Sequence, residues 1–201
     1  EQTAENSQGR LLKMKESTRL VVVLSVVCLV SALVVAIADD LTKDAIKLAR
    51  EKQRLSAVYE VQPEGATNIV EKTIAIPSPL DGSSATNSYW QTDKGYVIPV
   101  TVPNGYAGDI SLVLGFAGDD FWSYKVLEHS ETPGLGENIT GSFIEKVKRR
   151  PIFGTKWAVT KDDGDIEPIT AATISSRAIC DAIGQGIKIL EAIEIERDRH
   201  Q

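Results

Sequence analysis

The sequence predicts an α+β fold, with one membrane-spanning helix at the N-terminus followed by an antiparallel sheet with flanking helices. Three observations predict it: a charge-free apolar run over 20–38, strand-like segments between 96 and 127, and helical spacing of apolar residues after 174. Strands grouped together, with helices at the ends of the chain, are typical of α+β domains. The 201 residues are 42% hydrophobic and 25% charged, which fits one folded domain in addition to the apolar run.

The run from Leu20 to Ala38 contains no charged residue. At ~1.5 Å per residue, a helix of this length crosses the hydrocarbon core of a bilayer. A cleaved signal peptide is the alternative, and Ala36-Ile37-Ala38 resembles its cleavage site. The apolar core of a signal peptide is usually only about 7–15 residues long, so the length favours an uncleaved anchor.

Basic residues are nearly balanced on the two sides of the apolar run, so their count does not orient it. Large translocated domains largely escape the positive-inside rule. We therefore expect residues 1–19 to be a short cytoplasmic tail. The folded domain is expected on the periplasmic or extracellular side of the inner (plasma) membrane.

Helical spacing of apolar residues between Leu41 and Val58 predicts a helix that continues from the membrane or folds back onto the domain. Residues 62–88 are rich in Pro, Gly, Ser and Asn and bracket one strand candidate, 72–76. The expected division of the chain is a tail, a span, a connecting helix with an irregular segment, and a folded domain, over residues 1–19, 20–38, 39–88 and 89–201.

The middle of the chain predicts an antiparallel meander. Three strand-like segments are separated by turn signals at Asn104-Gly105 and Gly118-Asp119. Beyond them we expect a loop, a short helix, a further strand and a closing helix. The three strands are expected over 96–102, 110–116 and 121–127. The loop, short helix, further strand and closing helix are expected over 132–137, 141–147, 157–160 and 174–195.

The segment Thr170-Ala171-Ala172-Thr173 lies where a loop meets the closing helix. Thr173 is expected to be the N-cap, with Ser175 and Ser176 in the first turn. A helix N-terminus presents unpaired N–H groups and partial positive charge, which suit a phosphate. From this local chemistry alone, plain helix capping also stays open.

Several function classes have no support in the sequence. The net charge is −6, without the basic footprint of a nucleic-acid binder. The two cysteines and two histidines have no metal-ligand spacing. Serine-hydrolase, Walker and dinucleotide-binding motifs are absent from the sequence. We therefore expect neither a catalytic residue nor a metal site.

Three segments of the chain carry a resemblance. They read Gly-Tyr-Ala-Gly-Asp-Ile at 105–110, His-Ser-Glu-Thr-Pro-Gly-Leu-Gly at 129–136 and Thr-Ala-Ala-Thr-Ile-Ser-Ser at 170–176. In this order they resemble the FMN-binding domain of the G subunit of Rnf electron-transport complexes, whose close relative is the C subunit of the sodium-pumping NADH:quinone reductase. The resemblance covers about residues 90–195 together with the N-terminal anchor.

In that family, the last threonine of the third motif carries FMN through a phosphoester bond made by a dedicated flavin transferase. The resemblance therefore places covalent FMN on Thr173. It implies a flavin site that also includes Thr170, Ala172, Ile174, His129, Glu131, Thr132, Gly134, Leu135 and Tyr106. A flavin ring needs apolar walls, for which Tyr106, Leu135 and Trp157 are candidates, although core packing is the commoner role of an aromatic. His129 is expected either to donate to the ring or to order its own loop.

The resemblance implies a membrane-anchored electron-transfer subunit of an Rnf-type, ion-translocating ferredoxin:NAD⁺ oxidoreductase, with no catalysis of its own. Its implied partners are the other membrane subunits of the complex and the flavin transferase. Two alternatives remain open. One is the C subunit of the quinone reductase, and the other is a non-redox, membrane-anchored assembly module with an unmodified threonine.

Two residues depart from the family pattern. Ala171 stands where the family usually has glycine, and alanine is strained there if the backbone requires positive φ. Glu167 stands where an aspartate is usual, six residues before Thr173. The resemblance gives this carboxylate a role in engaging the metal-bound substrate of the transferase, and glutamate keeps the charge but reaches further.

Overall fold

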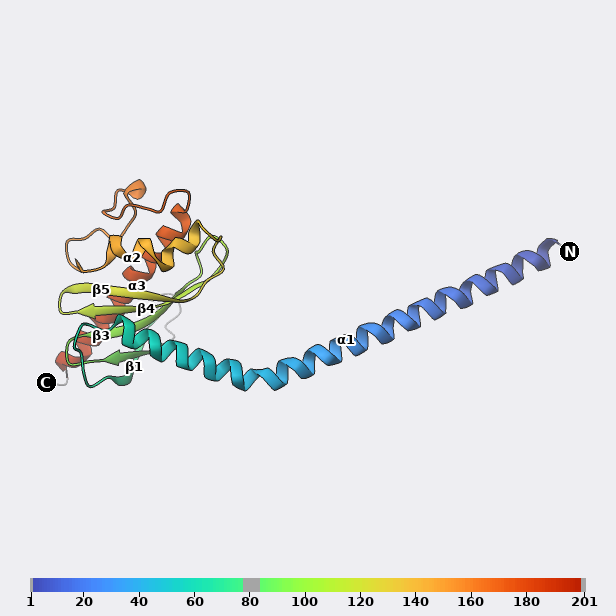
Figure 1. Cartoon of the computed structure of the whole chain (residues 1–201), viewed down its shortest axis with the longest axis horizontal. Helices are drawn as coiled ribbons and strands as arrows, with labels where there is room; N and C mark the ends of the chain where they lie inside the picture. The colour runs from blue at the N-terminus through green and yellow to red at the C-terminus, as the bar shows by residue number, and fades with distance from the viewer. Residues whose placement is uncertain (1, 78–83, 200–201) are drawn as a thin grey trace. The chain divides into compact units, whose positions relative to one another are not determined.

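The computed structural model describes residues 2–77 and 84–199, with the backbone alone described for residues 2–17, 76–77 and 84–85. Figure 1 shows the long helix α1 (Gln2–Val61) and the folded domain. The large apolar side chains between Leu20 and Ile37 are 51–70% exposed. This part of α1 is long and apolar enough to cross a membrane, and the protein itself does not bury it. The expected membrane-spanning helix is thus present.

The folded domain contains a six-stranded antiparallel sheet whose strands follow one another in chain order. The three-strand meander expected at its centre is confirmed, with Val100 opposite Leu112 and Leu114 opposite Tyr124. The strands are β1 (Val70–Pro77), β2 (Ser84–Gln91), β3 (Tyr96–Val102), β4 (Ile110–Ala117), β5 (Asp120–Glu128) and β6 (Arg150–Pro151).

One face of the sheet is covered by α3 (Thr173–Arg199), the short helix α2 (Ser142–Val147) and the 3₁₀ turn η1 (Gly136–Thr140). Apolar residues of α3 at helical spacing, including Ile179 and Ile183, belong to the same buried core as Phe116 and Phe121 of the sheet. Gly186 allows the close approach of α3, because a Cβ at this position would lie 2.3 Å from Leu114 Cδ1. The main core therefore holds α3, and with it Thr173, firmly on the sheet.

The opposite face of the sheet is covered by the last turns of α1. Ala57 and Val58 are buried against Trp90, Val97 and Val113. The Arg54 guanidinium lies 4.6 Å from the centre of the Trp90 ring, and its Nη2 donates a hydrogen bond to Ser88 Oγ. The helix expected after the membrane span thus ends as part of the folded domain.

The segment 62–88 contains more sheet than its composition predicts. Besides β1, which includes the expected strand 72–76, β2 pairs with β1 from Ser84 to Gln91. The sequence of β2 is polar and therefore gives no strand signal. The strand is instead ordered by its pairing with β1 and by burial of Tyr89 and Trp90. Residues 78–83, inside the expected irregular segment, lie outside the described residues. The compact domain begins at Lys52, so it differs from the expected division at residue 89.

The strand predicted over 157–160 is wrong. Val159 forms a single bridge with Ile166, and the chain then turns into the 3₁₀ turn η2 (Thr160–Asp162). The sheet edge beside β5 is occupied by the short strand β6 instead. Trp157 packs edge-to-face on Phe121, with ring centroids 5.3 Å apart, so a side chain with high strand propensity serves the core from a loop.

Candidate functional site

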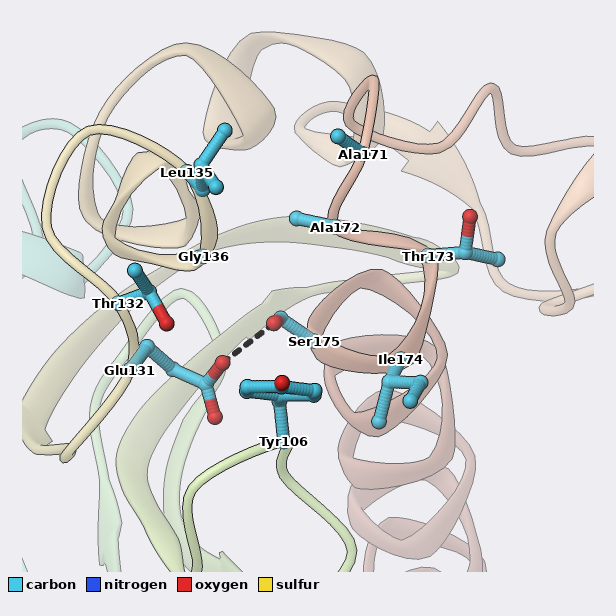
Figure 2. A pocket seen from close by; sticks show the side chains of 10 residues that line it. All are labelled: Tyr106, Glu131, Thr132, Leu135, Gly136, Ala171, Ala172, Thr173, Ile174 and Ser175. Carbon is cyan, nitrogen blue, oxygen red and sulfur yellow. Dashed lines mark hydrogen bonds between the residues drawn. The ribbon is translucent and has the colours of Figure 1, made fainter.

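A pocket of about 450 Å³ lies where three segments of the domain meet. These are the turn before β4, the loop between β5 and η1, and the start of α3, as Figure 2 shows. The volume falls in the range of small-molecule sites. The pocket is lined by Tyr106, Glu131, Thr132, Leu135, Gly136, Ala171, Ala172, Thr173, Ile174 and Ser175.

Large apolar side chains around the pocket remain exposed to solvent. Tyr106 is 66% exposed, and Leu135 and Ile174 are each 44% exposed. Tyr106 and Ile174 lie near each other, and Leu135 projects from the facing loop (Figure 2). Apolar side chains grouped in an open pocket are typical of a ligand site, because a bound ligand removes them from water.

One buried carboxylate joins the three segments. Glu131 is only 4% exposed, and it accepts hydrogen bonds from Ser175 Oγ at 2.5 Å and from the Ala107 N–H at 3.3 Å. Two glycines leave room for it: a Cβ on Gly136 would lie 2.5 Å from Glu131 Oε2, and one on Gly105 would lie 2.7 Å from Oε1. The geometry of the pocket therefore depends on the carboxylate of Glu131 and on the absence of side chains beside it.

Thr173 is a partly exposed residue, and its side chain lies at the edge of the pocket (Figure 2). Lys161 Nζ, from the turn η2, donates a hydrogen bond to Thr173 Oγ1 at 3.0 Å. Four residues further along α3, Arg177 pairs with Asp162 through two hydrogen bonds of 2.5 and 2.7 Å. The start of α3 is thus bordered by an ammonium group that the sequence did not single out.

Thr173 does not occupy the N-cap position predicted for it. It is the first residue of α3, and the Ala172 carbonyl accepts the Ser176 N–H at 3.1 Å. Ser176 is buried, and its Oγ accepts the Ile169 N–H at 2.9 Å, which fixes the preceding loop to the helix. Among the hydrogen bonds of the described residues, the Thr173 hydroxyl therefore bonds Lys161 and does not cap α3.

Ala171 lies in the left-handed region, with φ of 62°. For an L-residue other than glycine this conformation costs roughly 1–2 kcal/mol, so alanine is strained where the family pattern has glycine. The backbone at residue 171 therefore does require positive φ, which is the condition for strain that the sequence left open. The strain is located two residues before Thr173.

We expect Ala171→Gly to raise the free energy of unfolding by about 1 kcal/mol, because relief of the strain exceeds the added chain entropy. Thermal unfolding of the full chain in detergent measures this change. Ala172→Gly is the control. Ala172 is buried and lacks positive φ, so loss of its methyl group should lower the free energy of unfolding. Equal or lower stability of Ala171→Gly would contradict the strain.

The structure brings together seven of the ten site residues expected from sequence. Tyr106, Glu131, Thr132, Leu135, Ala172, Thr173 and Ile174 all line the pocket. Thr170, His129 and Gly134 do not line it. His129 Nδ1 accepts the Glu131 N–H at 3.2 Å, which is the loop-ordering role.

Sequence reasoning missed Gly136, Ala171 and Ser175 as pocket residues, and Lys161 as the partner of Thr173. Trp157, expected as a possible wall, belongs to the core: it packs on Phe121 and its Nε1 donates to the Ile152 carbonyl at 3.2 Å. One of these residues had a signal in the sequence. Ser175 is a polar residue in the first turn of α3, and such a residue needs a hydrogen-bond partner if it is buried.

Comparison with known proteins matches the same region of the chain. A family model described as the FMN-binding domain matches residues 105–188, which contain every residue that lines the pocket. The chain is similar over most of its length to proteins named as the G subunit of an ion-translocating oxidoreductase complex. It is 31% identical to the protein of Pseudoalteromonas atlantica over 80% of this chain and 82% of the relative. It is 31% identical to that of Methanosarcina acetivorans over 90% and 97%, and 32% identical to that of Vibrio vulnificus over 78% and 81%.

Proposed function

Because this chain belongs to the family of G subunits of ion-translocating oxidoreductase complexes, we propose that it transfers electrons through FMN attached covalently to Thr173. The N-terminal helix is a single-pass membrane anchor, and the chain binds FMN as part of a complex with other subunits. In this proposal the complex is an Rnf-type ferredoxin:NAD⁺ oxidoreductase, and the chain has no catalysis of its own. The relatives are named G subunits, which favours this function over that of the quinone reductase C subunit.

The residues around the pocket fit FMN. Tyr106, Leu135 and Ile174 offer apolar surface to a ring system, and the exposed Thr132 offers a hydroxyl. The observation that most supports the proposal is the Thr173 hydroxyl, which lies at the rim of this pocket on the first residue of a helix. Backbone N–H groups at a helix N-terminus favour a phosphate.

Attachment is a phosphoryl transfer. A bond forms between Thr173 Oγ and the phosphorus of FMN, while the anhydride bond of an activated flavin nucleotide donor breaks. The hydroxyl proton passes to a base of the flavin transferase, and the rest of the donor leaves as a phosphate ester. Bound FMN supplies one-electron chemistry, and the chain holds it against loss by diffusion.

The transferase must reach Thr173 from the side of the membrane on which the folded domain lies, which we propose is the periplasmic or extracellular side. Co-expression of the full chain with a flavin transferase tests attachment and topology together. With an exported transferase, we expect protein that is yellow after denaturation. With a transferase retained in the cytoplasm, or with none, we expect colourless protein. A colourless product in every arm would refute covalent attachment, and a yellow product with the cytoplasmic enzyme alone would refute the topology.

A further inference from the structure

The geometry points to Lys161 as the residue that binds the phosphate on Thr173. This inference rests on the proposed attachment of FMN and adds a phosphate-positioning residue to the site. The Nζ of Lys161 lies 3.0 Å from Thr173 Oγ1, the atom that would become the ester oxygen. No other cation donates to Thr173 Oγ1 among the hydrogen bonds of the described side chains.

The loop that carries Lys161 is anchored in the core. Val159 and Ile166 are fully buried and bridge each other, so the residues between them form a closed turn. Gly164 completes the turn: a Cβ there would lie 2.0 Å from the Ala158 carbonyl oxygen. The loop therefore has a defined path over the start of α3, and Lys161 lies at its tip in η2.

A charge pair fastens this tip to α3. Asp162, next to Lys161, makes two hydrogen bonds to Arg177, which lies one helical turn after Thr173. The hydrogen bonds and charge of Arg177 lower the pKa of the Asp162 carboxyl, so this pair stays ionised at neutral pH. Both attachments place the Lys161 ammonium beside Thr173.

The acidic character of the loop favours a cation at this point. The same loop carries the acidic residues Asp163, Asp165 and Glu167, which are exposed. A phosphodiester on Thr173 would add one further negative charge to this part of the domain. A lysine ammonium is a compact point charge suited to phosphate, and in the unmodified protein Lys161 already donates to the oxygen that would carry it.

A thermodynamic cycle separates this role from a merely structural one. We would prepare the full chain with and without covalent FMN, as the native sequence and as Lys161→Gln, Lys161→Arg and Lys188→Gln. Lys188→Gln removes the same charge from an exposed position further along α3. The quantity measured is the rise in thermal unfolding midpoint caused by flavin attachment. A lysine that only holds the loop would change both forms of the protein equally, so the rise would stay constant.

We expect the rise to fall by half or more in Lys161→Gln, to be restored in Lys161→Arg, and to be unchanged in Lys188→Gln. High salt should reduce the rise in the native sequence to the Lys161→Gln value. An equal rise in Lys161→Gln and the native sequence would overturn the inference. If Lys161→Gln does not fold or accepts no flavin, the native protein and Lys161→Arg test the inference instead. A rise in the native protein that does not change with salt would overturn the inference. A smaller rise in Lys161→Arg than in the native protein would also overturn it. If the native sequence itself accepts no flavin, the proposed function is what fails.

Discussion

Replacing Thr173 with alanine is expected to abolish covalent flavin while leaving the domain folded. The substitution removes the only atom of this residue that can form a phosphoester. The side chain is partly exposed, and its hydroxyl bonds to the exposed Lys161, so little packing is lost. Alanine also has a higher helix propensity than threonine, so we expect the free energy of unfolding to change by less than about 1 kcal/mol.

In-gel flavin fluorescence after denaturation measures the effect, and circular dichroism on heating checks the fold. Two matched controls lie close by. Thr173→Ser keeps the hydroxyl and should keep the flavin. Thr170→Ala changes an exposed threonine that does not line the pocket, and should reduce attachment less than Thr173→Ala does. A fluorescent band from Thr173→Ala would show that FMN is attached elsewhere.

Gly136→Ala is expected to damage the pocket without touching Thr173. The new Cβ would lie 2.5 Å from Glu131 Oε2 and 2.8 Å from Ser175 Oγ, so the pair that joins the loop to α3 must separate. Over-packing of this kind costs roughly 1–3 kcal/mol. The pair is also buried, and a carboxylate separated from its donors adds to the cost. We expect a lower unfolding midpoint and less flavin per protein.

The matched control is Gly184→Ala on α3, where an added Cβ meets no atom within 4 Å. That substitution should leave the flavin content unchanged and stabilise the helix by about 0.5–1 kcal/mol. Thermal unfolding and flavin absorbance of the three proteins are the measurements. If Gly136→Ala matches the native protein in both, the carboxylate does not hold the pocket together.

Most of the fold follows from local pattern. The strands β3, β4 and β5 combine high strand propensity with clear turn signals, and α3 repeats isoleucines at helical spacing. The two failures have a common cause. The strand β2 has a polar sequence and is ordered by its partner, and Trp157 lies in a loop because the core takes its ring. Tertiary packing overrides propensity in both segments.

The candidate site was predicted where it lies in contiguous motifs and missed where it depends on distant contacts. Thr173 and its neighbours belong to one motif, as do Glu131 and Leu135. The hydrogen bond from Ser175 to Glu131 joins residues 44 positions apart. The hydrogen bond from Lys161 to Thr173 joins a loop residue outside the motif to the first residue of α3. No periodicity predicts such pairs. The positive φ of Ala171 likewise depends on the whole loop and cannot be known from the alanine itself.

The most direct test of the account is the mass of one peptide from the protein purified from its own membrane. Trypsin cleaves after Lys161 and Arg177, and the peptide 162–177 contains Thr170, Thr173, Ser175 and Ser176. We predict that its mass is increased by one FMN less one water, and that fragmentation assigns the increase to Thr173. An unmodified peptide, or an increase assigned to another of these hydroxyls, would contradict the account.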